Sequence, residues 1–164
     1  MTNKIKPTAE TYEINNRIFF RLFQLGNILQ TKSTSNLGVT TVQWSVLGAL
    51  STEESKNGIH FGALVEYLMV SKQNLDGVLS RLERDDLVER KTGKHDRRSK
   101  LVFLTPTGRE YWNRIETGID AFYQESIAGF SVNERITLAY LFQKLHTNLK
   151  EMGDELLIAP LDPD

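Results

Sequence analysis

The sequence predicts a mostly α-helical protein with a small β wing. Apolar side chains recur at helical spacing along much of the 164-residue chain, whereas two short segments, 87–91 and 100–105, have the pattern of strands. Between these strands lies a polar stretch that contains Gly93, which suits a turn. A helix with one apolar stripe comes directly before the first strand. The centre of the chain is therefore expected to be a helix-turn-helix with a β wing.

Composition limits the classes of protein that the chain can form. With 40% hydrophobic and 25% charged residues and no cysteine, it has the composition of a globular protein without disulfides or thiolate metal sites. No signal peptide and no apolar run long enough to span a bilayer is visible, so a cytoplasmic protein without membrane contact is expected. The three histidines have no ligand spacing, and no phosphate-binding or nucleophile motif occurs. No metal, no cofactor and no catalytic residue is expected.

A long helix is predicted at the N-terminal end, over 11–31. Its apolar face is wider than packing on one neighbour requires, and a polar loop, 32–38, is expected after it. Thr40 with Gln43 forms a capping box that opens the next helix, and a further loop is expected at 53–58.

Two more helices are expected before the wing, over 59–70 and from the N-cap Ser71 to about residue 84. The second has one apolar stripe that predicts burial, formed by Leu75, Val78, Leu79 and Leu82. Its other face carries polar residues that include Lys72, Gln73, Asn74 and Arg81.

Two helices are predicted after the wing. Thr105 and Pro106 open the first as N-cap and first helical residue, and Gly118 is expected to interrupt it. Ser131 and Glu134 form a second capping box that opens the last helix. The terminal helices expose more apolar surface than so small a domain can bury, which predicts a homodimer.

Charge is concentrated at the wing. Residues 71–100 hold nine Lys or Arg against six Asp or Glu, although the whole chain has a net charge of −1. In an arbitrary protein such a loop is most often a solvated one. Here it follows a helix whose polar face has the side chains that bond base edges in the major groove, so the arrangement favours double-stranded DNA as the partner.

The run "SKQNLDGVLSRLERDDLVERKTGKHDRRSKLVFLTPTGRE" resembles the winged helix-turn-helix core of MarR-type transcriptional regulators. The most specific elements are "RLERDDLVER", the Asp-x-Arg motif met by Asp96 and Arg98, and "LTPTG". The chain departs from the family pattern at Asp86, where glycine is usual, and at His60, where a Ser or Thr cap is usual. An aspartate tolerates the left-handed conformation, so the first departure is expected to have a small effect on stability.

The resemblance implies a repressor that binds a pseudo-palindromic operator through a recognition helix, 71–84, and a wing, 88–104. Residues 37–104 would form the DNA-binding region, and residues 1–36 with 105–164 the helical dimerisation region. Arg98 would enter the minor groove, held by Asp96. The full set of expected DNA contacts is Ser71, Lys72, Gln73, Asn74, Arg81, Lys94, Asp96, Arg97 and Arg98.

Regulators that resemble this chain are often released from DNA by a small aromatic or phenolic ligand. The residues expected to line such a pocket are Arg17, Phe20, Arg21, Trp44, His60, Tyr67 and Tyr111. Two alternatives remain open at this point. Several of these side chains are as well explained as core or solvated residues, and the winged helix could serve as a protein–protein interaction module without specific DNA binding.

Overall fold

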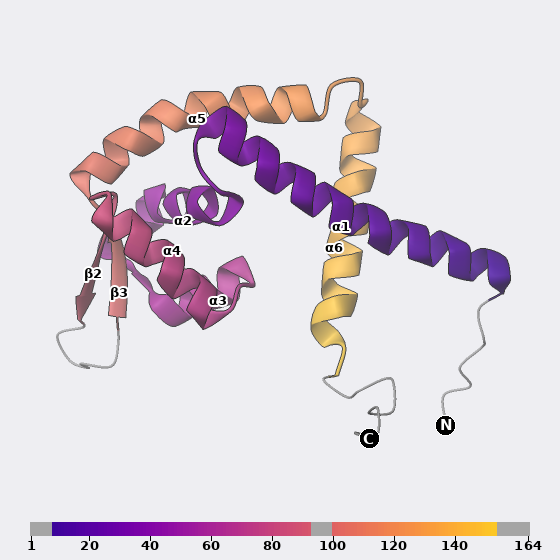
Figure 1. The fold of residues 1–164 in the computed structure, drawn as a ribbon, viewed down its shortest axis with the longest axis horizontal. Coiled ribbons are helices and arrows are strands. Elements are labelled where there is room, and N and C mark those ends of the chain that lie inside the picture. The colour runs from indigo at the N-terminus through magenta and orange to yellow at the C-terminus, as the bar shows by residue number, and fades with distance from the viewer. Residues whose placement is uncertain (1–7, 93–99, 154–164) are drawn as a thin grey trace, which may run out of the picture. The chain divides into compact units, whose positions relative to one another are not determined.

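The computed structural model describes residues 8–92 and 100–153 (Figure 1). Within these residues the chain forms six α-helices, one 3-10 helix and a three-stranded sheet. In chain order the elements are α1 Ala9–Leu37, α2 Thr41–Ser51, η1 Glu53–Asn57, β1 Ile59–His60, α3 Phe61–Leu68, α4 Lys72–Arg84, β2 Val88–Thr92, β3 Lys100–Leu104, α5 Pro106–Ser126 and α6 Val132–Glu151. The chain divides into two compact units, one up to Phe122 and one from Tyr123 onward.

Helix α1 is longer than predicted, because residues 32–37, expected as a loop, continue the helix. The polar side chains in this stretch bond within the fold: the Thr34 hydroxyl donates to the Gln30 carbonyl, and the buried Ser33 hydroxyl donates to the Val39 carbonyl at 2.5 Å. The helix ends at Gly38, which has a φ of 73° and whose N–H bonds the Thr34 carbonyl.

The predicted cap of α2 is confirmed. The Thr40 hydroxyl accepts from the Gln43 N–H at 3.2 Å, and the Gln43 side chain accepts from the Thr40 N–H at 2.9 Å. The expected loop at 53–58 was wrong in part, since Glu53–Asn57 forms a 3-10 turn.

The sheet has a strand that was not predicted. Ile59 and His60, expected to begin a helix, form β1, which pairs antiparallel with β3 and places Ile59 opposite Val102. The strand order is β1-β3-β2. The two predicted strands of the wing are confirmed, with Val88 opposite Leu104 at the start of β2.

The core lies among α2, α3, α4 and the sheet, which are close together in Figure 1. The predicted apolar stripe of α4 is confirmed, because its four members are all buried. Burying one leucine or valine side chain contributes about 1.5–3 kcal/mol, so this stripe fixes which face of α4 points inward. The buried side chains of the core are Val46, Leu47, Leu50, Leu64, Leu75, Val78, Leu79, Leu82, Val88 and Val102.

Helix α5 starts as predicted but is not interrupted. The Thr105 hydroxyl accepts from the Gly108 N–H at 2.9 Å, and the helix runs through Gly118 to Ser126. A Cβ on Gly118 would lie 3.3 Å from the Leu37 side chain, so this glycine allows close packing of α1 rather than a break. In the second unit, the Ser131–Glu134 capping box of α6 is confirmed.

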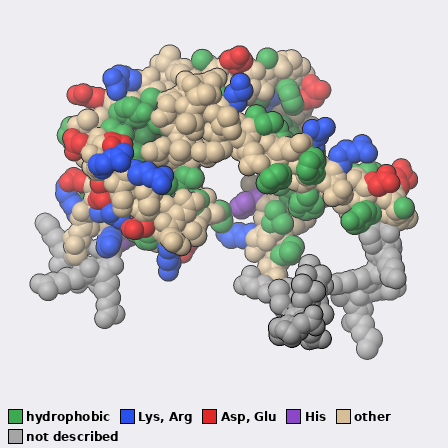
Figure 2. All heavy atoms as spheres, in the orientation of Figure 1, with side chains coloured by type: hydrophobic (Ala, Val, Ile, Leu, Met, Phe, Trp, Pro, Cys, Tyr) green, Lys and Arg blue, Asp and Glu red, His purple; other side chains and the backbone are tan. Residues whose placement is uncertain are grey.

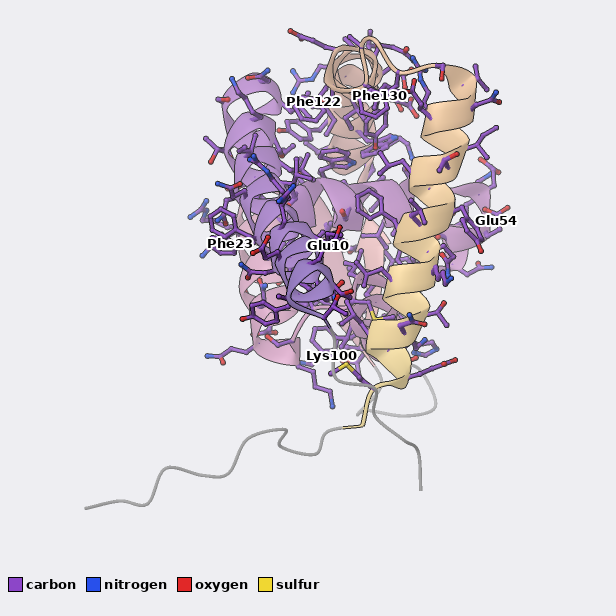
Figure 3. The ribbon with its side chains drawn as sticks, turned by 90° about the vertical axis from the view of Figure 1, so that its right-hand side faces the viewer. Glu10, Phe23, Glu54, Lys100, Phe122 and Phe130 are labelled. Carbon is purple, nitrogen blue, oxygen red and sulfur yellow. The ribbon has the colours of Figure 1, made fainter. Side chains whose placement is uncertain are left out.

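Helix α1 leaves most of its apolar side chains exposed. Figure 3 shows Phe23, which is 65% exposed, projecting outward from the helix, and Figure 2 shows hydrophobic side chains at the surface along α1. Across the described part of the chain, no helix has the length and apolar character needed to cross a bilayer.

Candidate nucleic-acid interface

Helix α4 carries the polar face that the sequence predicted for DNA contact. The Ser71 hydroxyl caps the helix by accepting from the Asn74 N–H at 3.1 Å. Because the apolar stripe is held in the core, the polar residues of the opposite face are turned to solvent. The predicted contacts on this element are all exposed: Ser71, Lys72, Gln73, Asn74 and Arg81.

The wing strands follow this helix, with Lys91 and Lys100 exposed near the ends of β2 and β3. The Lys91 ammonium lies 4.9 Å from the centre of the Phe103 ring on β3 and 2.5 Å from Glu89 Oε1. The predicted contacts at the tip, Lys94, Asp96, Arg97 and Arg98, lie outside the described residues.

A groove of about 670 Å³ lies at the N-terminal end of α4. Its lining comes from α3, α4 and the strands β1 and β3: His60, Phe61, Gly62, Lys72, Gln73, Asp76 and Lys100. It therefore brings together the side chains of His60, Lys72 and Lys100 from separate elements, and it also contains the Asp76 carboxylate. His60 was predicted as a ligand residue, and its place in this groove was not predicted. It lies here because β1 pairs with β3, a contact between segments far apart in the sequence.

Arg90 joins the wing to α4, a role that sequence reasoning missed. Its guanidinium lies 2.6 Å from Asp76 Oδ1 and 2.5 Å from Glu83 Oε2, and it donates to the Ser80 hydroxyl at 3.2 Å. Hydrogen bonding to Glu83 raises the pKa of Arg90, burial opposes this, and Asp76 adds a smaller increase. The spacing of the acceptors on α4, at 76, 80 and 83, was the available signal.

A second junction ties the end of α4 to the start of α5. Asp86 has a φ of 56°, the left-handed conformation expected at this departure from glycine. Its carbonyl accepts from the Thr105 hydroxyl at 2.6 Å, and its carboxylate accepts from the Thr107 hydroxyl at 2.9 Å. The β wing is thus anchored at its base on both sides, by Arg90 and by Asp86.

The residues expected to bind a ligand are spread over several elements. Arg17, Phe20 and Arg21 are exposed on α1, where Arg21 donates to Gln24 at 3.0 Å. Tyr67 is 73% exposed on α3.

The other two candidates pack more closely. Trp44 packs edge-to-face on Phe122 with ring centres 6.0 Å apart. Tyr111 lines a different groove from His60, a cavity of about 710 Å³ bordered by α2, α4 and α5. Within the described residues, no three His, Asp or Glu side chains are grouped to hold a metal ion.

The chain is similar to transcriptional regulators of known family. A model described as the MarR family matches residues 37–99. The chain is 42% identical over 146 residues to the transcriptional activatory protein BadR of Rhodopseudomonas palustris, with 87% of this chain and 83% of BadR covered. It is 29% identical to the homoprotocatechuate degradative operon repressor of Escherichia coli, with 65% of this chain and 70% of the repressor covered.

The fold agrees with these relatives. Sco3205, a MarR family transcriptional regulator from Streptomyces coelicolor whose crystal structure is a complex with DNA, matches with a TM-score of 0.77 at 20% identity, covering 92% of this chain and 94% of Sco3205. The match to BadR extends over most of both proteins, and the winged helix-turn-helix coincides with the family model. The chain therefore belongs to the MarR family of DNA-binding transcriptional regulators, which are not enzymes.

Proposed function

We propose that this regulator is a homodimer that binds a pseudo-palindromic operator, with one α4 in the major groove of each half-site. The observation that carries the proposal is the exposed polar face of α4, which the buried stripe on the other side holds outward. A helix fits the major groove, and dimers place two such helices about one helical turn apart on the duplex.

The side chains of α4 divide by chemistry. Gln73 and Asn74 suit adenine edges, and Lys72 and Arg81 suit guanine edges or phosphates. Ser71 already accepts a backbone hydrogen bond as the helix cap, and its hydroxyl proton remains to be donated to a phosphate oxygen. His60 and Lys100, which share the groove with Lys72, are added here as phosphate contacts.

The wing is proposed to reach the neighbouring minor groove. Arg98 would enter it, with Asp96 as its hydrogen-bond partner, and Lys94 and Arg97 would contact phosphates. These residues would position the protein and add affinity, whereas α4 would supply most of the direct base readout.

Dimerisation is proposed to cover the exposed apolar surface of the terminal helices, so that residues 1–36 and 105–164 form the dimerisation region and residues 37–104 the DNA-binding region. The exposed apolar side chains of α1 are Tyr12, Ile14, Ile18, Phe19, Phe20, Phe23, Leu25, Ile28 and Leu29. Those of α6 are Val132, Ile136, Leu138, Tyr140, Leu141, Phe142 and Leu149. Surfaces of this kind are rare on monomeric proteins.

The direction of regulation follows from where the operator lies. The expectation of repression is not confirmed, because one relative, BadR, is named an activator and another is named a repressor. We propose that the dimer represses where the operator overlaps a promoter and activates where it lies upstream. A reporter with the operator at each position, compared with and without the protein, tests this.

A small aromatic acid is proposed to release the dimer from DNA. One relative is named for the operon that degrades homoprotocatechuate, an aromatic acid, and Arg17 and Arg21 could meet a carboxylate. Trp44 and Tyr111 offer aromatic surface. Calorimetry with a panel of hydroxylated aromatic acids should show binding that Arg17→Ala or Arg21→Ala weakens. Absence of binding across the panel would oppose this part of the proposal.

The operator is tested by selecting bound sequences from random duplex DNA and titrating salt on the selected site. A palindromic consensus and a steep fall of affinity with salt are expected. If the dimer enriches no sequence at low salt, the winged helix is instead a protein-interaction module.

A further inference from the structure

Arg90 lies on β2 but makes its side-chain contacts with α4. The acceptors are Asp76, Ser80 and Glu83, which are spaced four and three residues apart and therefore lie on one side of the helix. The Arg90 side chain is only 19% exposed, so these bonds are partly shielded from water. A shielded arginine fork that joins two elements fixes their relative position better than an exposed ion pair does.

Glu83 sets the register of this contact. Its Oε1 accepts from the Arg90 backbone N–H at 3.1 Å, and its Oε2 accepts from Arg90 Nε at 2.9 Å. One carboxylate thus holds both the main chain of β2 and the guanidinium. Bonds to both parts of the same residue restrict sliding of the strand along the helix as well as rotation of the side chain.

Asp76 connects the Arg90 contact to the surface proposed for DNA. It is 58% exposed and lines the same groove as Lys72 and Gln73. A carboxylate there would repel phosphates. The Arg90 guanidinium, 2.6 Å from Asp76 Oδ1, offsets this charge without itself standing on the surface.

We propose that Arg90 is a positioning residue that sets the wing against the recognition helix at the spacing needed for both to enter their grooves together. This inference rests on the proposed function. In this proposal Arg90 contributes to operator specificity without contacting DNA, because its guanidinium donates to three groups of α4. Operator binding needs the recognition helix and the wing to meet their grooves at the same time. Non-specific binding along phosphates does not need this.

The test compares the affinity for the selected operator with that for an unrelated duplex at one salt concentration. Arg90→Gln should lower the ratio of these affinities about tenfold, toward the low end of the effect of one specific contact. Arg90→Lys, which keeps the charge but has no planar fork, should lower it similarly. Arg84→Gln is the matched control. It removes the same charge from an exposed arginine that pairs with its neighbour Asp85, and should leave the ratio unchanged.

The salt dependence separates positioning from direct contact. If Arg90 bound a phosphate, Arg90→Gln would reduce the slope of log affinity against log salt by about 0.9 per contact. The slope is expected to stay at the wild-type value. Asp76→Ala should change two affinities in different ways. Removal of a surface acid should strengthen binding to the unrelated duplex, whereas the ratio of operator affinity to non-specific affinity should fall because one bond to Arg90 is lost.

Amide hydrogen exchange on the DNA-free dimer tests the same inference without an operator. Arg90→Gln should speed exchange in β2 and in the second half of α4, and Arg84→Gln should not, with circular dichroism confirming that both variants are folded. Unchanged exchange would overturn the inference even if the operator is found. A reduced salt slope for Arg90→Gln, or an equal loss of affinity for the operator and for the unrelated duplex, would also overturn it. Failure to find any operator would count against the proposed function alone.

Discussion

At the scale of single residues, Gly108 is the glycine at which an added Cβ would come closest to a neighbouring atom in the described part of the chain. A Cβ at this position would lie 1.9 Å from the Leu87 carbonyl oxygen, a backbone atom that also accepts the Thr105 N–H. Gly108→Ala is therefore expected to lower the free energy of unfolding by about 1–3 kcal/mol or more, the usual cost of overpacking. Urea denaturation followed by circular dichroism measures the change.

The matched control for this variant is Gly77→Ala. A Cβ on Gly77, in the middle of α4, would meet no atom within 4 Å. The same substitution should then raise the free energy of unfolding by up to about 1 kcal/mol, because alanine is the better helix former. Equal effects of the two variants would contradict the close approach at Gly108.

At the scale of elements, Ser71 has two roles that substitutions can separate. It caps α4 through the Asn74 N–H, and it lies on the face proposed for DNA. Ser71→Ala should lower the free energy of unfolding by about 1 kcal/mol, the typical loss of an N-cap. Ser71→Asp should keep the cap and the stability but weaken operator binding, because it adds a negative charge facing phosphates. Chemical denaturation should show that Ser71→Asp is the more stable variant, and a binding titration should show that Ser71→Ala is the tighter binder of the operator.

The capping box of α6 gives a prediction for pH. The pKa of Glu134 lies below its ordinary value because the carboxylate accepts hydrogen bonds from the Ser131 hydroxyl and then from the Ser131 backbone N–H. Folding lowers this pKa, so the capping box stabilises α6 fully at pH values above the pKa that Glu134 has in the unfolded chain. The stabilisation is lost as the pH falls through the lower pKa of the folded state. An NMR titration should show the Glu134 pKa rise in Ser131→Ala. An unchanged Glu134 titration in this variant would contradict the box.

Elements that depend on local chemistry were predictable from the sequence. Thr40, Ser71 and Ser131 were assigned as caps because an N-cap bonds a backbone N–H only three residues away. The strand at Ile59 could not be read in this way, because its pairing partner, Val102, is far along the chain and two residues carry no periodicity.

The candidate site shows the same division. The exposed face of α4 followed from periodicity alone, whereas the role of Arg90 needed the distance between two elements. A cation in a basic stretch has the same sequence signature whether it binds DNA or the protein itself. Only its proximity to Asp76 and Glu83 distinguishes the two.

At the scale of the whole molecule, α1 cannot be explained by its own packing. Along the 29 residues of Ala9–Leu37, all of them described, Ser33 is the buried residue. Helices gain most of their stability from burying an apolar face, so a helix of this length and exposure requires a partner surface. In the proposed dimer the second copy supplies it.

This requirement gives the last prediction. Ile18 and Leu25 lie seven residues apart on one side of α1 and are both about half exposed. The double substitution Ile18→Glu with Leu25→Glu should convert the dimer to monomers in sedimentation equilibrium, because two charges would be buried without partners. Operator affinity should then fall steeply, since each half-site would be bound separately. Tyr67→Glu, at an exposed aromatic residue outside α1, is the control and should remain dimeric. A double variant that stays dimeric would place the interface elsewhere and leave the exposed face of α1 to a different partner.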